Sequence, residues 1–458
     1  MMETPICDFV RDYCARDALR LHMPGHKGRA LLGMEALDIT EFDGADELYQ
    51  AEGIIRQSEE NAARLFGAAR TLYSAEGSSL CIRAMLYLAR LHAGENGLRP
   101  VVAAGRNAHK VFLTAAALAG LDVDWLYPEN PESLIACTVE PAMLEEYLAT
   151  HERPAAVYIT SPDYLGNLAD VGALSAVCRR YGVLLLVDNA HGAYLHFLPE
   201  PCHPLDLGAD ICCDSAHKTL PALTGAAYLH FSENAPAALL EQAENALSVF
   251  ASTSPSYLIL QSLDAVNRYL DDGYRARLCE TVRRTDALKA RLAAHGFEIR
   301  GTERTKLTLA PKSFGYTGDA LAEHLLAADI FFEFHDPDYL VAMFTPETSP
   351  ADFDRLERAL CAVERQASIP DMPPLPGRPA RVCAPRTALF SPAALLPVEN
   401  CVGRVLAAAN VGCPPAVPIV ACGERIDENA LRCFRYYGIK TCSVMKARPR
   451  KQNNAAGT

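Results

Sequence analysis

The 458-residue sequence contains no apolar run of the roughly 18 residues that a membrane-spanning helix needs. Its first residues, Met1 to Arg11, hold acids and Pro5 in place of the basic residues and apolar stretch of a signal peptide. Positive charge is also scarce, because the formal net charge is -13, whereas nucleic-acid binders usually carry a basic patch. From these absences we expect a cytoplasmic protein that binds neither membrane nor nucleic acid.

Paired cysteines are missing as well. The 16 cysteines are scattered, without CxxC units and without histidines at zinc spacing, so no metal site is predicted. Cys212 and Cys213 are adjacent in an apolar stretch, where small buried side chains are common. In a chain of this length, reduced core cysteines are favoured over a disulfide framework, which again indicates the cytosol.

Alternating apolar segments and helical patterns dominate the first 270 residues. The expected strands are Val101–Gly105, Ala155–Thr160, Val183–Asp188 and Ala209–Cys213. Helices are expected between them, including Leu113–Leu121 and Val171–Tyr181. Apolar strands separated by helices indicate an α/β fold with a mostly parallel sheet covered on both faces. Ligands in such sheets bind beyond the carboxyl ends of the strands.

After about residue 270 the pattern changes to that of a smaller α+β domain, with an expected strand at Lys306–Ala310 and expected helices at Arg275–His295, Ala320–Ala328 and Asp352–Val363. The proline-rich stretch Pro370–Pro385 reads as a linker. Lys446 to Thr458 is expected to be disordered. The length suits two or three domains, and we predict units at 1–270, 271–370 and 371–458.

Lys218 is the strongest chemical signal. It follows the expected strand ending at Cys213, and Ser215, His217 and Lys218 emerge together just after that strand. A lysine beside the binding crevice is a candidate for forming a Schiff base with a carbonyl cofactor. On spacing alone an ordinary surface lysine is the commoner interpretation.

Asp188 raises the odds for that chemistry. It ends the neighbouring apolar run, thirty residues before Lys218. Pyridoxal phosphate (PLP) needs an acidic partner for its pyridine nitrogen, because the protonated ring is the electron sink for a carbanion. At ~4 Å and an effective dielectric near 20, such an ion pair is worth about 4 kcal/mol. By itself Asp188 is equally explained as a residue that caps a turn.

Two further patterns fit a phosphate-bearing ring. The turn Glu76–Ser79 offers glycine and hydroxyls before a helix expected to begin near Leu80, which could form an anion cradle or merely an N-cap. His109 follows the strand Val101–Gly105 and could stack on a ring, although a lone histidine is more often structural.

Together these segments resemble the Orn/Lys/Arg decarboxylase family, whose members are PLP enzymes of the aspartate-aminotransferase fold (PLP fold type I). The matching stretches are His22–Gly28, Arg106–Lys110, Asp188–Ala193, Ser215–Thr219 and Ser252–Tyr257. The stretch His22–Gly28 contains Pro24, Gly25 and Gly28, so it is expected to be a shaped loop. Weaker similarity continues through Lys306–Leu307, Gly403–Arg404 and Pro414–Pro418. The chain has no room for the N-terminal wing domain of the long members, so it resembles the short form.

The resemblance implies a role for each matching residue. Lys218 would carry PLP, and Asp188 would pair with the ring nitrogen. The ring would lie between His109 and Ala190, and Ser78, Ser79 and Ser215 would grip the phosphate beside His217. It also implies a homodimer with shared active sites, in which Thr253 and Ser254 approach the partner's site.

The sequence departs from the family pattern near these residues. Leu80, Cys81 and Ile82 follow the phosphate turn in place of residues that include a glycine and an asparagine. Asn189 stands where an acid is expected, Tyr194 where a histidine is expected, and Gly225 where a glutamine is usual. These departures leave substrate choice and turnover open.

The leading hypothesis is PLP-dependent decarboxylation of a basic L-amino acid (arginine, lysine or ornithine) to a polyamine precursor. Another PLP reaction, such as transamination or a lyase step, is the first alternative, since one scaffold supports several chemistries. A cofactor-binding relative without turnover is the second. Asp43, Asp46, Glu47 and Glu333 are acidic candidates for the cationic end of the substrate, and the sequence selects none of them.

Overall fold

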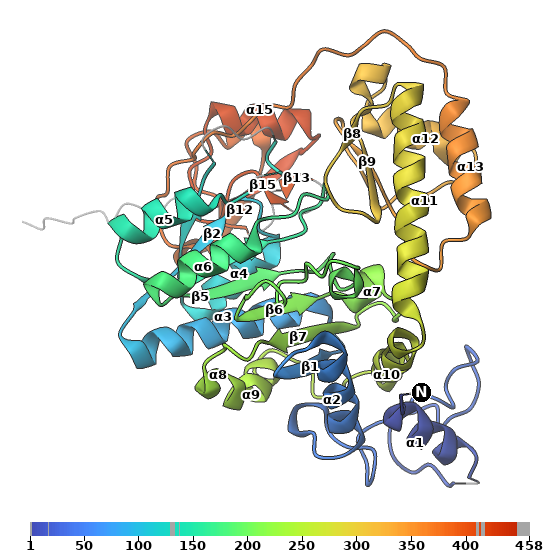
Figure 1. The fold of residues 1–458 in the computed structure, drawn as a ribbon. Coiled ribbons are helices and arrows are strands. Elements are labelled where there is room, and N and C mark those ends of the chain that lie inside the picture. Colours follow the sequence, from blue (N-terminus) through green and yellow to red (C-terminus); the bar gives the residue numbers. More distant parts are fainter. Residues whose placement is uncertain are drawn as a thin grey trace, which may run out of the picture.

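A computed structural model of the protein describes residues 2–16, 18–128, 133–136, 138–408, 412–413 and 417–446 (Figure 1). The expected tail from Lys446 onward lies outside these residues except for Lys446 itself, and so do Pro414, Pro415 and Ala416 of the last matching stretch. No helix within these ranges is long and apolar enough to cross a bilayer. The 14 cysteines whose side chains the structure describes are free thiols.

The core of the molecule is a seven-stranded sheet with the order β1-β7-β6-β5-β4-β2-β3. Strands β6, β5, β4, β2 and β3 are parallel, and β7 runs antiparallel to both of its neighbours. The strands are β1 (Arg70–Ser74), β2 (Arg99–Gly105), β3 (Asp122–Leu126), β4 (Pro154–Thr160), β5 (Leu184–Asp188), β6 (Ile211–Asp214) and β7 (Ala227–Phe231). The predicted mostly parallel α/β sheet is thus confirmed.

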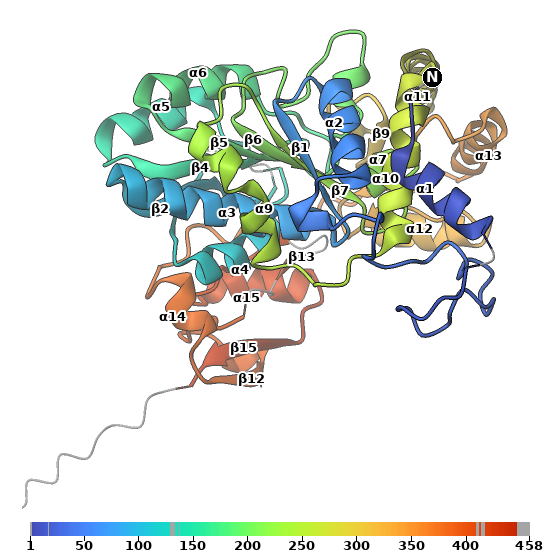
Figure 2. The same cartoon turned by 90° about the horizontal axis from the view of Figure 1, so that it is seen from below.

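Alternate strand residues pack into two separate apolar clusters, one on each face of the sheet. Leu186 lies in the cluster that contains α3 (Gly77–Asn96) and α4 (Lys110–Ala119). Leu185 and Val187 lie in the cluster that contains α5 (Pro141–Thr150) and α6 (Val171–Tyr181). Successive side chains of a strand point to opposite faces of the sheet, and helices cover both faces. The strands are therefore continuous apolar runs and not alternating patterns. Figure 2 shows the helices on the two sides of the sheet.

Several element ends differ from the sequence-based bounds for local reasons. The strand expected from Ala209 begins at Ile211, since the Asp210 carboxylate instead accepts the Leu185 N–H. The helix expected near Leu113 begins three residues earlier, at Lys110, with the His109 ring accepting the Val111 N–H as its cap. The helix expected near Leu80 begins at Gly77.

A second, four-stranded antiparallel sheet has the order β10-β11-β9-β8 and lies beside the long helix α11 (Figure 1). Its strands are β8 (Ile299–Arg300), β9 (Lys306–Leu309), β10 (Phe334–His335) and β11 (Leu340–Met343). Its helices are α11 (Tyr274–His295), α12 (Gly318–Leu326) and α13 (Pro350–Cys361). The last two begin about two residues before the expected bounds, where the hydroxyls of Thr317 and Ser349 cap them.

The N-terminal part packs on the β1 edge of the large sheet. It comprises α1 (Pro5–Cys14), the 3-10 turn η1 (Leu48–Gln50), α2 (Ile54–Phe66) and α10 (Tyr257–Asp271), which share one apolar cluster. The segment between α1 and η1, which contains His22–Gly28, forms loops and turns as expected. Both views place this segment at the periphery (Figures 1 and 2).

The C-terminal region follows an extended segment that runs from α13 across the top of the view in Figure 1. It contains α14 (Pro385–Leu389), β12 (Ala393–Pro397), η4 (Val398–Asn400), β13 (Gly412–Cys413), β14 (Val417–Pro418), α15 (Glu428–Tyr436) and β15 (Thr441–Met445). The remaining short helices are η2 (Leu195–Phe197), α7 (Ala216–Thr219), α8 (Ala237–Glu241), α9 (Ala243–Ser248) and η3 (Pro311–Phe314). The division into units at 1–270, 271–370 and 371–458 stays a prediction.

Candidate active site

A cavity of about 240 Å³ lies at the carboxyl ends of the parallel strands. Asp188 is the last residue of β5, Ser215 follows β6, and β5 and β6 are neighbours in the sheet. All eight expected site residues line this cavity: Ser78, Ser79, His109, Asp188, Ala190, Ser215, His217 and Lys218. We call this set, with Gly77, the sheet side of the cavity.

Lys218 projects from the short helix α7 and is partly buried. Its Nζ lies 3.2 Å from Nε2 of His191 and 5.9 Å from the ring centre of Tyr164. Burial lowers the pKa of Lys218 below its ordinary value, against the opposing charges of Asp188 and Glu333. The amine of Lys218 therefore loses its proton more readily than the amine of a surface lysine.

Asp188 is 2% exposed and is held in one orientation. The Tyr158 hydroxyl donates to its Oδ2 at 3.1 Å, and the Ala190 N–H donates to its Oδ1 at 3.2 Å. A buried carboxylate with two fixed donors can present its charge to a cationic ring nitrogen.

Asn189 is completely buried and its amide donates to Oδ1 of Asp214 at 2.7 Å. Burial alone would raise the pKa of Asp214, but His203 and His230 beside it hold that pKa well below its usual range. Where an acid is expected, Asn189 thus supplies an amide that is bonded to the neighbouring carboxylate of Asp214.

His203, Asp214 and His230 are also the residues that come nearest to a metal-binding group in the described part of the chain. Nε2 of His203 lies 3.0 Å and Nε2 of His230 3.3 Å from Asp214 Oδ2. On the other side of each ring, His203 Nδ1 accepts the Leu205 N–H, and His230 Nδ1 lies 2.8 Å from the Thr71 hydroxyl. Hydrogen bonds thus account for both nitrogens of His203 and for Nδ1 of His230, whereas Nε2 of His230 contacts Asp214 at ion-pair distance without a hydrogen bond.

The N-terminus of α3 opens on the cavity through Gly77, Ser78 and Ser79. The preceding residue, Glu76, supplies no side-chain cap, because its carboxylate accepts the Ser252 N–H instead. Ser215 donates its hydroxyl proton to Ser78 Oγ at 2.9 Å. The Gly77 N–H donates to the Gly225 carbonyl at 2.7 Å, and the following first-turn N–H groups, with the hydroxyls of Ser78 and Ser79 beside them, suit an anion such as a phosphate.

The two histidines of the prediction differ in their surroundings. Burial lowers the pKa of His109, although the Asp188 charge opposes this, so the neutral form of its ring is favoured. Nδ1 of His217 bonds to the Ala226 carbonyl at 2.9 Å, which leaves Nε2 for the cavity. Ala190 is buried and completes the small space beside Asp188.

Of the departures from the family pattern, Ile82 is the one that joins the described lining. Leu80 and Cys81 are completely buried in the cluster of the large sheet. Gly225 has φ +98, and a Cβ there would lie 3.1 Å from the Ala75 carbonyl oxygen, so a larger residue would strain this turn.

Tyr194 points away from the cavity toward the second sheet. Its hydroxyl donates to Oε1 of Glu303 at 3.0 Å, and Oε2 of Glu303 pairs with Lys306 Nζ at 3.0 Å. Glu303 and Lys306 are both 1% exposed, so this is a buried ion pair. Lys306 also donates to the backbone carbonyl of Asp163, a cavity residue, at 3.3 Å.

Thr253 and Ser254 lie away from the described lining of the cavity of their own chain. Thr253 lines a surface pocket beside Glu47 and Ser252. Their loop is tied to the phosphate turn through the bond from Ser252 to Glu76. Their approach to a partner's site stays a prediction.

Sequence reasoning missed several lining residues. His191 and Asn107 lie inside matching stretches but received no role, and the partner of His191 is 27 positions away along the chain. Tyr164 and Ile135 come from turns and carried no local signal, and Val417, the first residue of β14, lies in the weakly matching stretch Pro414–Pro418 but received no role. We call these last three the loop side of the cavity.

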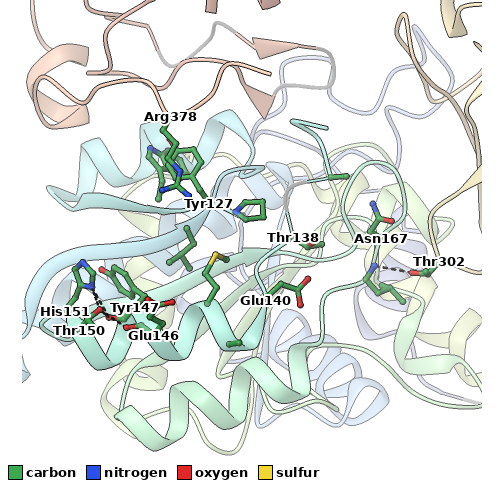
Figure 3. Close-up of a pocket in the computed structure, with 17 residues that line it drawn as sticks. Tyr127, Thr138, Glu140, Glu146, Tyr147, Thr150, His151, Asn167, Thr302 and Arg378 are labelled. Carbon is green, nitrogen blue, oxygen red and sulfur yellow. Dashed lines mark hydrogen bonds between the residues drawn. The ribbon is translucent and has the colours of Figure 1, made fainter. Parts of the chain in front are cut away.

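A wider groove of about 1070 Å³ runs along α5 and the end of β3, with Tyr127, Glu140, Glu146 and Arg378 around it (Figure 3). Its polar groups bond to their neighbours, as Tyr147 does to Asp124 at 2.7 Å and Thr150 to His151 at 3.0 Å. It contains no lysine and none of the expected site residues. The smaller cavity is therefore the candidate active site.

The family model described as "Orn/Lys/Arg decarboxylase, major domain" matches residues 4–335. An arginine decarboxylase of Bacillus subtilis is 30% identical over 457 residues, which cover 93% of this chain and 92% of the relative. An arginine decarboxylase of Halalkalibacterium halodurans is 29% identical and the match covers 94% and 93% of the two chains.

Among solved structures, a lysine decarboxylase of Francisella novicida superposes with a TM-score of 0.79 at 16% identity, over 97% of this chain and 81% of that one. Lysine decarboxylase A of Pseudomonas aeruginosa gives 0.79 at 17% identity, over 96% and 80%. At this identity the likeness shows the fold, which is the expected fold type I.

Proposed function

The chain belongs to the Orn/Lys/Arg decarboxylase family, and on that premise we propose that it removes CO₂ from a basic L-amino acid, arginine first, with PLP bound in the cavity. One observation supports this above the others. A partly buried lysine, a buried carboxylate and an uncapped helix N-terminus all line one cavity of about 240 Å³.

The residues present fit PLP at each of its polar groups. Lys218 would bind the aldehyde carbon covalently, and Asp188 would pair with the ring nitrogen. Ser78, Ser79 and Ser215 would hold the phosphate, with His109 and Ala190 on either side of the ring. The side chains of Thr160 and His191 support the fit, since Thr160 Oγ1 and His191 Nδ1 are buried lining atoms without a hydrogen-bond partner in the described structure.

When bound, PLP supplies an electron sink for the pair left on the α-carbon as CO₂ departs. Asp188 would pair with the protonated ring nitrogen, and the bonds from Tyr158 and the Ala190 N–H hold the Asp188 carboxylate in place for that role. A proton must then reach the α-carbon. The 3.2 Å contact between Lys218 Nζ and His191 Nε2 supports these two groups as its source, with His217 beside them.

For the cationic end of the substrate we propose Glu333, which precedes β10 and lies outside the described lining of the cavity. Its charge acts on Lys218 and, after burial, helps raise the pKa of Tyr164 to about 12. Asp46 is a poorer candidate, because its carboxylate already accepts the N–H groups of Glu47, Gly53 and Ile55. Arginine is the first choice of substrate because four of the relatives matched over more than 90% of their length are arginine decarboxylases.

We also propose a homodimer in the cytoplasm. The segment between α1 and η1 exposes four leucines, Leu19 at 82%, Leu21 at 80%, Leu31 at 88% and Leu32 at 81%. Large apolar side chains gathered in one exposed segment are typical of a surface that a partner covers. A monomer in light scattering would contradict this, whereas a dimer that L31E/L32E dissociates would support it. The cysteine pattern of the sequence supports the cytoplasm.

The test of the function is an absorbance spectrum before and after borohydride, followed by CO₂ release from arginine, lysine and ornithine. We expect a yellow protein that borohydride bleaches, a label on Lys218, and CO₂ from arginine above the other two. A labelled Lys218 with a keto acid and no CO₂ would indicate transamination instead. A protein that cannot take up PLP would refute the proposal.

A further inference from the structure

The loop side of the cavity contains one residue from the C-terminal region, Val417, although the family match ends at residue 335. Val417 is 3% exposed and lines the cavity together with Ile135, which is 1% exposed. Both belong to one apolar cluster that also contains Phe334 of the second sheet and Leu165. Four segments of the chain, around residues 135, 165, 334 and 417, therefore pack together at or behind this wall.

Arg106 fixes the segment that follows Val417. Its guanidinium is 2% exposed and donates to the carbonyls of Pro418 at 2.8 Å and Ile419 at 3.1 Å. It also pairs with Glu424 Oε2 at 3.2 Å. A guanidinium that reaches two carbonyls and a carboxylate at once sets the position of that segment more narrowly than a point charge could.

Glu424 completes the turn from its other end. Its Oε2 accepts the Ala421 N–H at 2.6 Å, and its side chain is 4% exposed. The segment 417–424 is thus folded around one buried ion pair. On the sheet side, Arg106 directly follows β2 and lies in the same loop as Asn107 and His109, which line the cavity.

We propose that Val417 is a specificity-determining residue whose side chain limits the space for the substrate, and that Arg106 and Glu424 are positioning residues that hold it there. This rests on the proposed function, because it assigns the loop side to the amino-acid substrate. It makes the C-terminal region a wall of the active site. Glu333 would then bind the charged end of the substrate, and Val417 would limit the length of its side chain.

The size of the side chain at 417 gives the direct test. One methylene in an apolar pocket discriminates substrates by roughly tenfold or more. We expect V417I to lower the ratio of kcat/KM for arginine over ornithine about tenfold, and V417A to raise it. V420I and V420A are matched controls, since Val420 is buried in the same cluster but away from the described lining. An unchanged ratio in both Val417 variants would overturn the proposal.

The positioning role has its own readout. In R106Q and E424Q we expect KM for arginine to rise about tenfold with kcat nearly unchanged and the cofactor absorbance intact, a pattern of lost binding rather than lost chemistry. R106K should recover part of the loss. If R106Q fails to fold, E424Q still tests the positioning role. This variant should fold, because glutamine keeps an oxygen that can accept from Arg106 and from the Ala421 N–H. A fall in kcat with constant KM would refute positioning.

Binding can be separated from turnover with agmatine, the amine that arginine leaves on losing CO₂. Its Kd is measured from the shift in the absorbance of the bound cofactor. V417I should weaken agmatine binding about tenfold relative to V420I. A wild-type enzyme that releases no CO₂ would refute the proposed function alone, and the agmatine titration would still decide on the wall.

Discussion

The two sides of the cavity are built in different ways. The sheet side consists of polar and charged residues at the ends of neighbouring strands, so the register of one sheet brings them together. The loop side consists of Ile135, Tyr164 and Val417, and buried ion pairs hold it from behind, Arg106 with Glu424 and Lys306 with Glu303. On the proposed function, the sheet side would carry the chemistry and the loop side would limit the space for the substrate.

Loss of the covalent lysine should have the largest effect and should belong to the sheet side alone. We expect K218A to lower kcat by roughly 10³-fold or more, because Lys218 is the one lysine in the described lining of the cavity. Its melting temperature should remain close to that of the wild-type apoprotein. Borohydride should leave the variant unlabelled, and a label on another lysine would mean that the site is misassigned.

Asp188 tests whether the charge on the sheet side controls the chemistry. An ion pair at ~4 Å is worth about 4 kcal/mol, so D188N should lower kcat about 10³-fold. Y158F is the control, since it removes one 3.1 Å hydrogen bond to Asp188 and should cost only about 1 kcal/mol. Equal losses in the two variants would show that orientation, not charge, is what Asp188 contributes.

The sheet side could be predicted from the sequence and the loop side could not. Asp188 and Lys218 each follow an apolar run that predicts a buried strand, and parallel strands deliver such ends to the same edge. Val417 and Ile135 pack in one cluster, and Arg106 binds the 417–424 turn beside them, a contact across 312 positions of sequence. Two departures from the family pattern are explained by partners that only the structure shows. Tyr194 donates to Glu303, and Asn189 donates to Asp214.

Breaking a support of the loop side should change stability more than chemistry. K306M would leave Glu303 buried without its cation, which typically costs about 3–5 kcal/mol of unfolding free energy. The double variant E303Q/K306M should recover most of this, because it leaves no uncompensated charge. Urea unfolding measures both. If K306M were as stable as the wild type, the Lys306–Glu303 ion pair would not support the loop side.

The Glu333 carboxylate tests whether substrate recognition is separate from the chemistry of the sheet side. We expect E333Q to raise KM for arginine about tenfold, close to the loss of one charge-assisted hydrogen bond, with kcat and the cofactor spectrum unchanged. D319N, on the exposed partner of His335 nearby, is the matched charge control. A lowered kcat with constant KM would move Glu333 to the chemistry.

The pH dependence of cofactor uptake should show the smallest effect and connects the two sides. Only the uncharged amine of Lys218 attacks the aldehyde, and burial lowers its pKa from the ordinary 10.5. Uptake by the apoprotein should therefore rise with pH, with a midpoint below 10.5. Between the lowered pKa and 10.5 the unfolded chain holds a proton that the folded chain has lost, so the apoprotein also gains stability as pH rises through that window. Because the Glu333 charge opposes the shift, E333Q should move the midpoint lower still. A midpoint at or above 10.5 would mean that Lys218 is solvated, and the sheet side would lose its reactive amine.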